Sequence, residues 1–280
     1  MILVVRSSDG IEKEERRKMM KVISVSNIKG GVGKSSTAAT LGAGLADKGY
    51  KVLMIDSDPQ TNLTMSFLPE QPDDALSLYH VYAEGKNIDE VKVGLREGLD
   101  LVIGDFALCN ADMQFLKAGR LKLLEKTLKN QKEKYDFVVV DTPPNLGVLS
   151  LNAFIASDYI IVPMAADSFS LKGVRLLKQA LDDVDEELGR KIDVVGILLT
   201  KYNRRTNVSK LLENSLHSAA ELLDTKVFDS RIRQAVVVQE SQLAKEDLFS
   251  YAPKALVTDD YMRFVDEFLE RVGCKNVWEK

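Results

Sequence analysis

Short apolar runs alternate with amphipathic stretches along most of the chain after its first twenty residues. Between the runs lie helical stretches such as 36–48 and 170–188, each followed by a glycine at which the helix is expected to end. Nearly continuous apolar strands that alternate with helices are typical of a parallel sheet covered on both faces. The pattern therefore predicts an α/β fold with a doubly wound, mostly parallel sheet and helices on both faces. The runs that favour buried strands are 22–25, 51–55, 137–140, 159–162 and 194–199.

The first twenty residues differ from the rest, and we interpret residues 1–20 as an N-terminal extension. The charge-mixed run 12–18 fits either a short helix or a solvated tail. A length of 280 residues is compatible with one or two domains. Because the alternation of strands and helices continues from the first apolar run onward, we expect residues 21–280 to form a single domain.

Composition narrows the classes of protein only a little. Hydrophobic residues make up 45% of the chain and charged residues 29%, which is ordinary for a globular protein with a sizeable core. The formal net charge is −4, so any contact with nucleic acid has to come from a local basic patch. Cys109 and Cys274 lack metal-ligand spacing, and neither a membrane-spanning run nor a signal peptide is visible. We expect a cytoplasmic protein with reduced thiols.

A glycine-rich loop separates the first strand from the first helix, which is the context that a phosphate-binding loop requires. Its glycines let successive N–H groups point at phosphate oxygens, and the helix N-terminus adds partial positive charge. We expect Lys34 to reach the β- and γ-phosphates and the Ser35 hydroxyl to ligate Mg²⁺. A turn without a ligand is the alternative, which the Gly-Lys-Ser ending disfavours. The expected phosphate-loop residues are Gly30, Gly31, Val32, Gly33, Lys34, Ser35 and Ser36.

Acidic side chains follow two of the predicted strands, at the sheet edge where α/β proteins bind ligands. Asp56 and Asp58 come directly after the strand 51–55, where they either cap the strand end or take part in nucleotide chemistry. The phosphate loop favours the second interpretation. Asp141 follows the strand 137–140, and we expect it to hold Mg²⁺ through a water because this ion sheds its hydration reluctantly. Each acid alone is a weak signal, whereas three motifs in this order are a strong one.

Together these motifs resemble the deviant Walker-A family of P-loop NTPases, which includes ParA/Soj partition ATPases, MinD and the nitrogenase iron protein. The resemblance rests on Lys29 beside the loop, and on Ile28 where the usual loop has a glycine. It implies the P-loop NTPase fold of that family, ATP and Mg²⁺ as cofactors, and an ATP-dependent homodimer in which Lys29 reaches the partner's nucleotide. It further implies that Asp58 positions the attacking water, that Asp56 lies near Mg²⁺, and that Asn62 belongs to a second nucleotide motif.

Within the family the chain looks most like ParA/Soj, over most of residues 21–270. The iron protein needs cluster-ligating cysteines, and the two isolated cysteines here do not serve. MinD ends in a basic membrane-binding helix, whereas the last predicted helix here, 259–272, is mostly acidic at its polar positions and is expected to pack on the core. Larger ParA proteins carry an N-terminal operator-binding domain, for which residues 1–20 are too few. Further matching segments are Asn152-Ala153, 162–174, 196–200 and 205–207.

Basic residues are frequent between positions 201 and 233, a segment that contains seven Lys or Arg and four Asp or Glu. The resemblance implies that Arg205 and Arg233 contact DNA, with Arg204 and Arg231 as neighbours. Contacts of this kind to phosphates are salt-sensitive and independent of sequence. A solvated basic edge is the alternative. The following residues, 234–238, depart from the family's proline-containing turn, which leaves the adenine contacts of the loop 231–245 open.

The function expected from these residues is an ATPase that dimerises with ATP and then binds non-specific DNA, so that it is nucleoid-associated in that state. A ParB-like activating partner would stimulate hydrolysis, and the cycle would partition plasmid or chromosomal DNA, with no membrane involved. A ParA-like positioner of a protein cargo and a MinD-like membrane-associated regulator are the alternatives. A metabolic ligase or metal-insertion ATPase on the same fold is disfavoured because the sequence shows no substrate or metal site for it.

Overall fold

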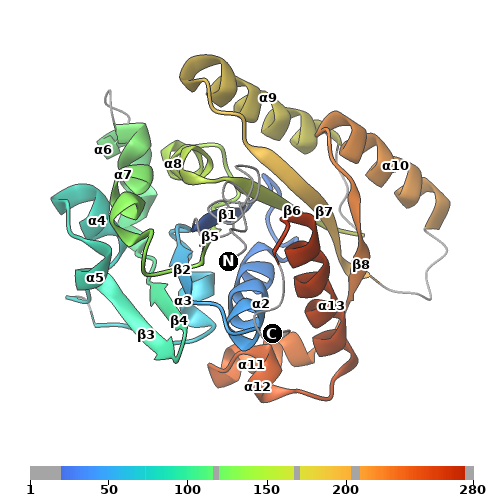
Figure 1. The fold of residues 1–280 in the computed structure, drawn as a ribbon, viewed down its shortest axis with the longest axis horizontal. Helices are drawn as coiled ribbons and strands as arrows, with labels where there is room; N and C mark the ends of the chain where they lie inside the picture. The colour runs from blue at the N-terminus through green and yellow to red at the C-terminus, as the bar shows by residue number, and fades with distance from the viewer. Residues whose placement is uncertain (1–19, 73, 116–119, 167–170, 203–208, 275–280) are drawn as a thin grey trace, which may run out of the picture.

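The computed structural model describes residues 20–72, 74–115, 120–166, 171–202 and 209–274 (Figure 1). Within these ranges one eight-stranded sheet has the order β3-β4-β2-β5-β1-β6-β7-β8. Neighbouring strands are parallel except for the β3–β4 pair. The prediction of a mostly parallel sheet is therefore confirmed. The strands are β1 (Lys21–Val25), β2 (Val52–Asp56), β3 (Lys92–Arg96), β4 (Leu99–Val102), β5 (Phe137–Asp141), β6 (Tyr159–Ala165), β7 (Asp193–Tyr202) and β8 (Val227–Arg233).

Helices cover both faces of this sheet, as the sequence pattern predicts (Figure 1). The longer ones on one face are α2 (Lys34–Asp47) and α13 (Leu256–Arg271), joined there by α11 (Val237–Ala244) and α12 (Leu248–Tyr251). The opposite face carries α4 (Leu78–Glu84), α5 (Ile88–Val91), α7 (Leu123–Leu128), α8 (Val148–Ala156), α9 (Leu171–Leu188) and α10 (Ser209–Leu222). The remaining short helices are α3 (Asn62–Met65), α6 (Ala111–Phe115), η1 (Phe106–Asn110), η2 (Arg120–Lys122) and η3 (Lys129–Gln131).

The core is divided between the two faces because successive strand residues point to opposite sides. In β2, Val52 and Met54 pack with α2 and α13, whereas Leu53 and Ile55 pack with the helices of the other face. All four side chains are fully buried. A strand buried on both faces reads as a continuous apolar run, which is why pattern alone located β2.

Strands β3, β4 and β8 are not among the predicted elements. β3 and β8 are the two edges of the sheet, and each is only partly buried along its length. An edge strand meets solvent, so its sequence is not a continuous apolar run. The predicted extension lies, apart from Met20, outside the described residues.

The last helix packs on the core as expected, with Phe264, Val265 and Phe268 fully buried. Its first turn departs from the expectation, because Asp260 belongs with the polar positions in the sequence but is only 6% exposed. Side chains from β8 surround it, as described below. No helix in the described part of the chain combines the length and the apolar character needed to cross a membrane.

Candidate functional site

The glycine-rich loop joins the carboxyl end of β1 to the first residue of α2. Gly31 and Gly33 have φ angles of 75° and 88°, a left-handed conformation that side chains with a Cβ rarely adopt. The Lys34 ammonium donates a hydrogen bond to the carbonyl of Lys29 at 3.2 Å across the loop. From β7, the Thr200 hydroxyl donates to the Val32 carbonyl at 2.7 Å. The loop is therefore held in shape by its own lysine and by a neighbouring strand.

A cavity of about 790 Å³ opens beside this loop. Val32 in the loop is only 1% exposed, whereas Lys29 is exposed. The expected nucleotide residues that line the cavity are Gly30, Gly31, Gly33, Lys34, Ser35, Ser36, Asp58 and Asn62.

The opposite wall of the cavity comes from residues that the sequence left open. Gln234, Ala235 and residues along α11 form it, and the Gln242 amide donates to the Ser36 hydroxyl at 3.0 Å. Tyr261 of α13 also lines the cavity. No motif marks these positions in the sequence, because they reach the loop only through the packing of α11 and α13 on α2.

Asp141 is completely buried at the carboxyl end of β5, and neither of its carboxylate oxygens has a hydrogen-bond partner among the described residues. Burial raises the pKa of Asp141 well above its ordinary value, and the charge of Asp56 raises it further. The Ser35 hydroxyl and the Lys34 charge act in the opposite direction. A buried carboxylate without donors is costly, so this position is suited to a cation.

Lys34 faces two of the carboxylates from the loop. Burial lowers the pKa of Lys34, while the charges of Asp141 and Asp58 raise it in part. Asp58 is 5% exposed, lines the cavity and accepts a hydrogen bond from the Gln60 N–H at 2.9 Å. Lys34 and Asp58 thus line the cavity beside the phosphate loop, and Lys34 also interacts with the charge of the buried Asp141.

Asp56 differs from Asp141 in that both of its oxygens already accept hydrogen bonds. Thr64 donates from its N–H at 2.8 Å and its hydroxyl at 2.7 Å, and the Asp58 N–H donates at 3.2 Å. A Cβ at Gly104 would lie 2.9 Å from the carboxyl carbon, so only glycine allows this approach. Burial raises the pKa of Asp56 to about 6 against these hydrogen bonds. Asp56 thereby orders the start of α3, and its expected place near Mg²⁺ stays a prediction.

The available ligands fit a magnesium ion that is shared with phosphate rather than caged by protein. No group of three or more His, Cys, Asp or Glu side chains forms a metal cage within the described ranges. Mg²⁺ in nucleotide sites usually keeps several waters and uses few protein ligands besides phosphate oxygens. The open oxygens of Asp141 and the Ser35 hydroxyl match that requirement.

Residues 20–194 match a protein family described as an AAA domain. The chromosome-partitioning ATPase Soj of Treponema pallidum is 30% identical over 257 residues, which cover 91% of this chain and 99% of that protein. The chain belongs to the ParA/Soj family. Members of this family are ATPases.

Two solved structures resemble this ParA/Soj-family chain over most of its length. Cobyrinic acid a,c-diamide synthase from Mycobacterium smegmatis, with bound ADP and magnesium, has a TM-score of 0.76 and 30% identity, covering 89% of this chain and 93% of that one. A putative plasmid partition protein from Borrelia burgdorferi, bound to AMPPNP, has a TM-score of 0.70 and 26% identity, covering 90% and 97%.

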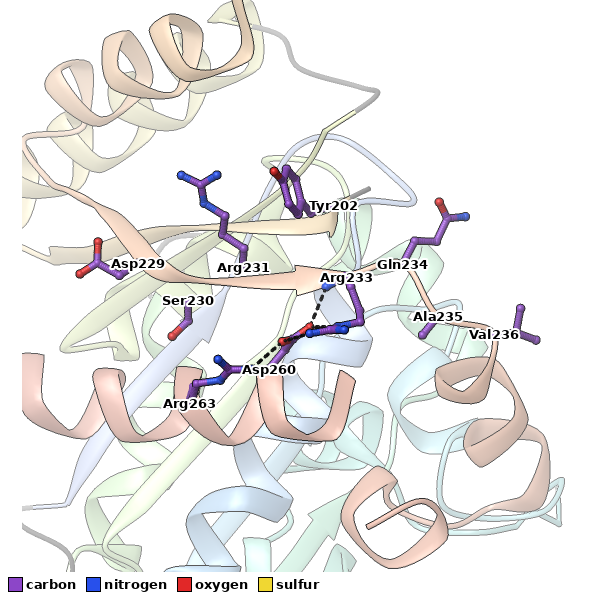
Figure 2. Close-up of a pocket in the computed structure, with 10 residues that line it drawn as sticks. All are labelled: Tyr202, Asp229, Ser230, Arg231, Arg233, Gln234, Ala235, Val236, Asp260 and Arg263. Atoms are coloured by element: carbon purple, nitrogen blue, oxygen red, sulfur yellow. Dashed lines mark hydrogen bonds and ion pairs between the residues drawn. The ribbon is translucent and has the colours of Figure 1, made fainter. Parts of the chain in front are cut away.

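The arginines expected to contact DNA are placed only in part. Arg231 and Arg233 lie on the edge strand β8 and line a groove of about 980 Å³ that also involves α13 (Figure 2). Arg204 and Arg205 lie outside the described residues. Sequence reasoning missed Arg263 of α13, which joins them in the groove. The residues of this arginine groove are Tyr202, Asp229, Ser230, Arg231, Arg233, Gln234, Ala235, Val236, Asp260 and Arg263.

Proposed function

We propose that this protein is an ATPase that dimerises with ATP and Mg²⁺, binds DNA without sequence preference, and partitions plasmid or chromosomal DNA with a ParB-like activating protein. The observation that supports it most is a shared wall. Arg233, Gln234 and Ala235 line both the nucleotide cavity and the arginine groove. A nucleotide in the cavity therefore lies against the residues that form the floor of a basic surface.

The chain's own residues account for the nucleotide half of the proposal. Loop N–H groups and Lys34 bind the phosphates, and Ser35 and Asp141 hold the ion. Magnesium, when bound, neutralises charge on the transferring phosphoryl group. Asp58 lines the cavity beside the loop and, in this proposal, orients the attacking water. Lys29 is exposed, and in this proposal it reaches the nucleotide of the second subunit.

Arg231 offers the cleanest test of the DNA half. Its side chain points away from Asp260 in Figure 2 and stacks over the Tyr202 ring at 5.5 Å. Binding of labelled random-sequence duplex DNA would be measured without nucleotide, with ADP and with ATP, at low and moderate salt. We expect binding with ATP only, and a salt slope about 0.9 smaller for Arg231→Ala. Lys191→Ala, which removes an exposed cation outside the groove, is the control.

Sedimentation of the same samples reports the dimer. If the protein forms ATP-dependent dimers that do not bind DNA, the proposed ATPase activity still stands but the proposed role in DNA partition is contradicted. A dimer that forms equally well with ADP would contradict the nucleotide switch itself.

The second candidate is a metabolic ATPase on the same fold, which the likeness to cobyrinic acid a,c-diamide synthase favours. Such an enzyme consumes ATP in step with the amidation or ligation of an organic acid. It has no use for an arginine groove outside the nucleotide cavity. Hydrolysis that is unchanged by DNA and by Arg231→Ala, together with no DNA binding, would favour this candidate.

A further inference from the structure

One buried carboxylate holds two of the three arginines of the arginine groove. Each oxygen of Asp260 accepts from two donors, as Figure 2 shows for the side chains. Arg233 donates to one oxygen from its Nε at 2.5 Å and its backbone N–H at 3.2 Å, and to the other from Nη2 at 2.8 Å. Arg263 Nη2 donates to that second oxygen at 3.1 Å. Asp260 is therefore saturated by guanidinium and backbone groups.

This ion pair removes much of the groove's positive charge. Burial raises the pKa of Asp260, but the hydrogen bonds from Arg233 and the charges of both arginines outweigh burial and lower it below its ordinary value. Asp260 is thus ionised at neutral pH. Its side chain is 6% exposed, whereas those of Arg233 and Arg263 are 37% and 68% exposed. Arg233 turns two of its guanidinium nitrogens toward this internal anion. Arg263 turns one nitrogen toward it, and its Nε donates to the Asp259 carbonyl at 3.2 Å.

A carboxylate and a phosphate offer a guanidinium the same pair of oxygen acceptors. Asp260 therefore fills the position that a phosphate oxygen of a ligand in the groove would take. A ligand phosphate must therefore displace Asp260 from the arginines, or bind after β8 and α13 have separated by about the length of a hydrogen bond. The pairing with Asp260 thus reduces the positive charge that Arg233 and Arg263 present in the groove.

The same ion pair lies next to the nucleotide cavity. Arg233 lines both cavity and groove, and Tyr261, the residue after Asp260, lines the cavity. Burial raises the pKa of Tyr261 to about 12, and the Thr37 and Thr40 side chains of α2 interact with its hydroxyl. A change in the cavity at Tyr261 or Arg233 therefore acts directly on the position of Asp260.

We propose that Asp260 is an internal competitor of DNA, which pairs with Arg233 and Arg263 until the ATP-bound state releases both arginines to DNA phosphates. This inference rests on the proposed function and adds to it a regulating carboxylate and a further contact, Arg263. Binding of DNA in the absence of ATP is weak because the groove's own anion occupies the arginines. Allosteric coupling of this kind requires that ATP and DNA favour the same arrangement of β8 and α13.

Asp260→Asn tests the competitor, because asparagine keeps an acceptor for the Arg233 N–H and removes the charge. We expect this variant to bind random-sequence duplex DNA without nucleotide at least about ten times more tightly than wild type, with a salt slope steeper by about 0.9 to 1.8. Asp266→Asn is the matched control. It removes the same charge from the same helix, where Asp266 pairs with Lys48 at 2.5 Å and is 46% exposed. We expect its DNA binding to equal that of wild type.

The outcomes separate the two hypotheses. If wild type binds DNA with ATP but Asp260→Asn matches Asp266→Asn, the competitor is overturned and the proposed function stands. If neither wild type nor Asp260→Asn binds DNA in any nucleotide state, the DNA half of the proposed function fails. Thermal unfolding shows whether Asp260→Asn is folded. If Asp260→Asn does not fold, Arg263→Gln provides a second test, because the Arg263 side chain is 68% exposed. A salt slope equal to that of wild type in the ATP state would overturn the role of Arg263.

Discussion

Asp56 and Asp141 occupy paired positions at the carboxyl ends of the adjacent parallel strands β2 and β5. Both are completely buried, yet Asp56 accepts hydrogen bonds from Thr64 and Asp58 while Asp141 accepts none from the described residues. This difference in hydrogen bonding gives the two carboxylates different roles. Asp56 orders the chain that carries Asp58, and Asp141 is left with open oxygens beside Ser35 and Lys34.

Asp141→Asn should separate stability from function. We expect the nucleotide-free variant to be more stable than wild type by about 1 to 2 kcal/mol, because a buried carboxylate without donors is replaced by a neutral group. Magnesium-dependent ATP hydrolysis should fall at least about a hundredfold. Thermal unfolding in EDTA and with magnesium and ADP, together with phosphate release, measures both effects. A variant that is less stable than wild type in EDTA, or that hydrolyses ATP normally, would contradict this reading of Asp141.

The stability of the nucleotide-free protein should fall as the pH rises from about 4 to 6. Burial raises the pKa of Asp56 to about 6 in the folded state, above its ordinary value of 3.8. The folded state then binds more protons than the unfolded state between these two values, so unfolding becomes easier as pH increases through the window. Asp141 acts in the same direction because its pKa is also raised. Acids whose pKa values are lowered, such as Asp260 and Glu267, have their effect at lower pH.

Urea denaturation in EDTA across that pH range measures this dependence. Asp56→Asn removes the titrating group, so its stability should vary less with pH than that of wild type. Equal slopes in the two proteins would show that Asp56 does not titrate in this window.

Two helical glycines should respond to alanine with opposite signs. A Cβ at Gly44 in α2 would lie 2.7 Å from Val265 and 3.2 Å from Phe249, so the side chain would force α13 away. We expect Gly44→Ala to destabilise by about 1 to 3 kcal/mol, in spite of the higher helix propensity of alanine. A Cβ at Gly173 in α9 meets nothing within 4 Å. Gly173→Ala should therefore be stabilising by up to about 1 kcal/mol. The denaturation midpoints of the two variants measure these changes in stability. If both substitutions change stability in the same direction, the packing argument is wrong.

Local pattern was sufficient for the centre of the sheet and for the phosphate loop. Strands such as β2 and β5 are buried on both faces, so burial leaves a continuous apolar signal in a short stretch of sequence. The loop is equally local, because its glycines, Lys34 and Ser35 act through backbone geometry within a few residues. The edge strand β8 could not be found in this way, since its outward positions carry charge.

Tertiary structure alone decided how the charged residues are used. In the sequence Asp56 and Asp141 are each an acid after an apolar run, and only the packing of Thr64 and Gly104 around one of them makes them different. Asp260 is one acid among several on an amphipathic helix, and no local sequence feature indicates that Arg233 is its partner. Ion pairs depend on distance in space and on burial, and the packing of α13 on β8 brings these residues together across 27 positions of the chain.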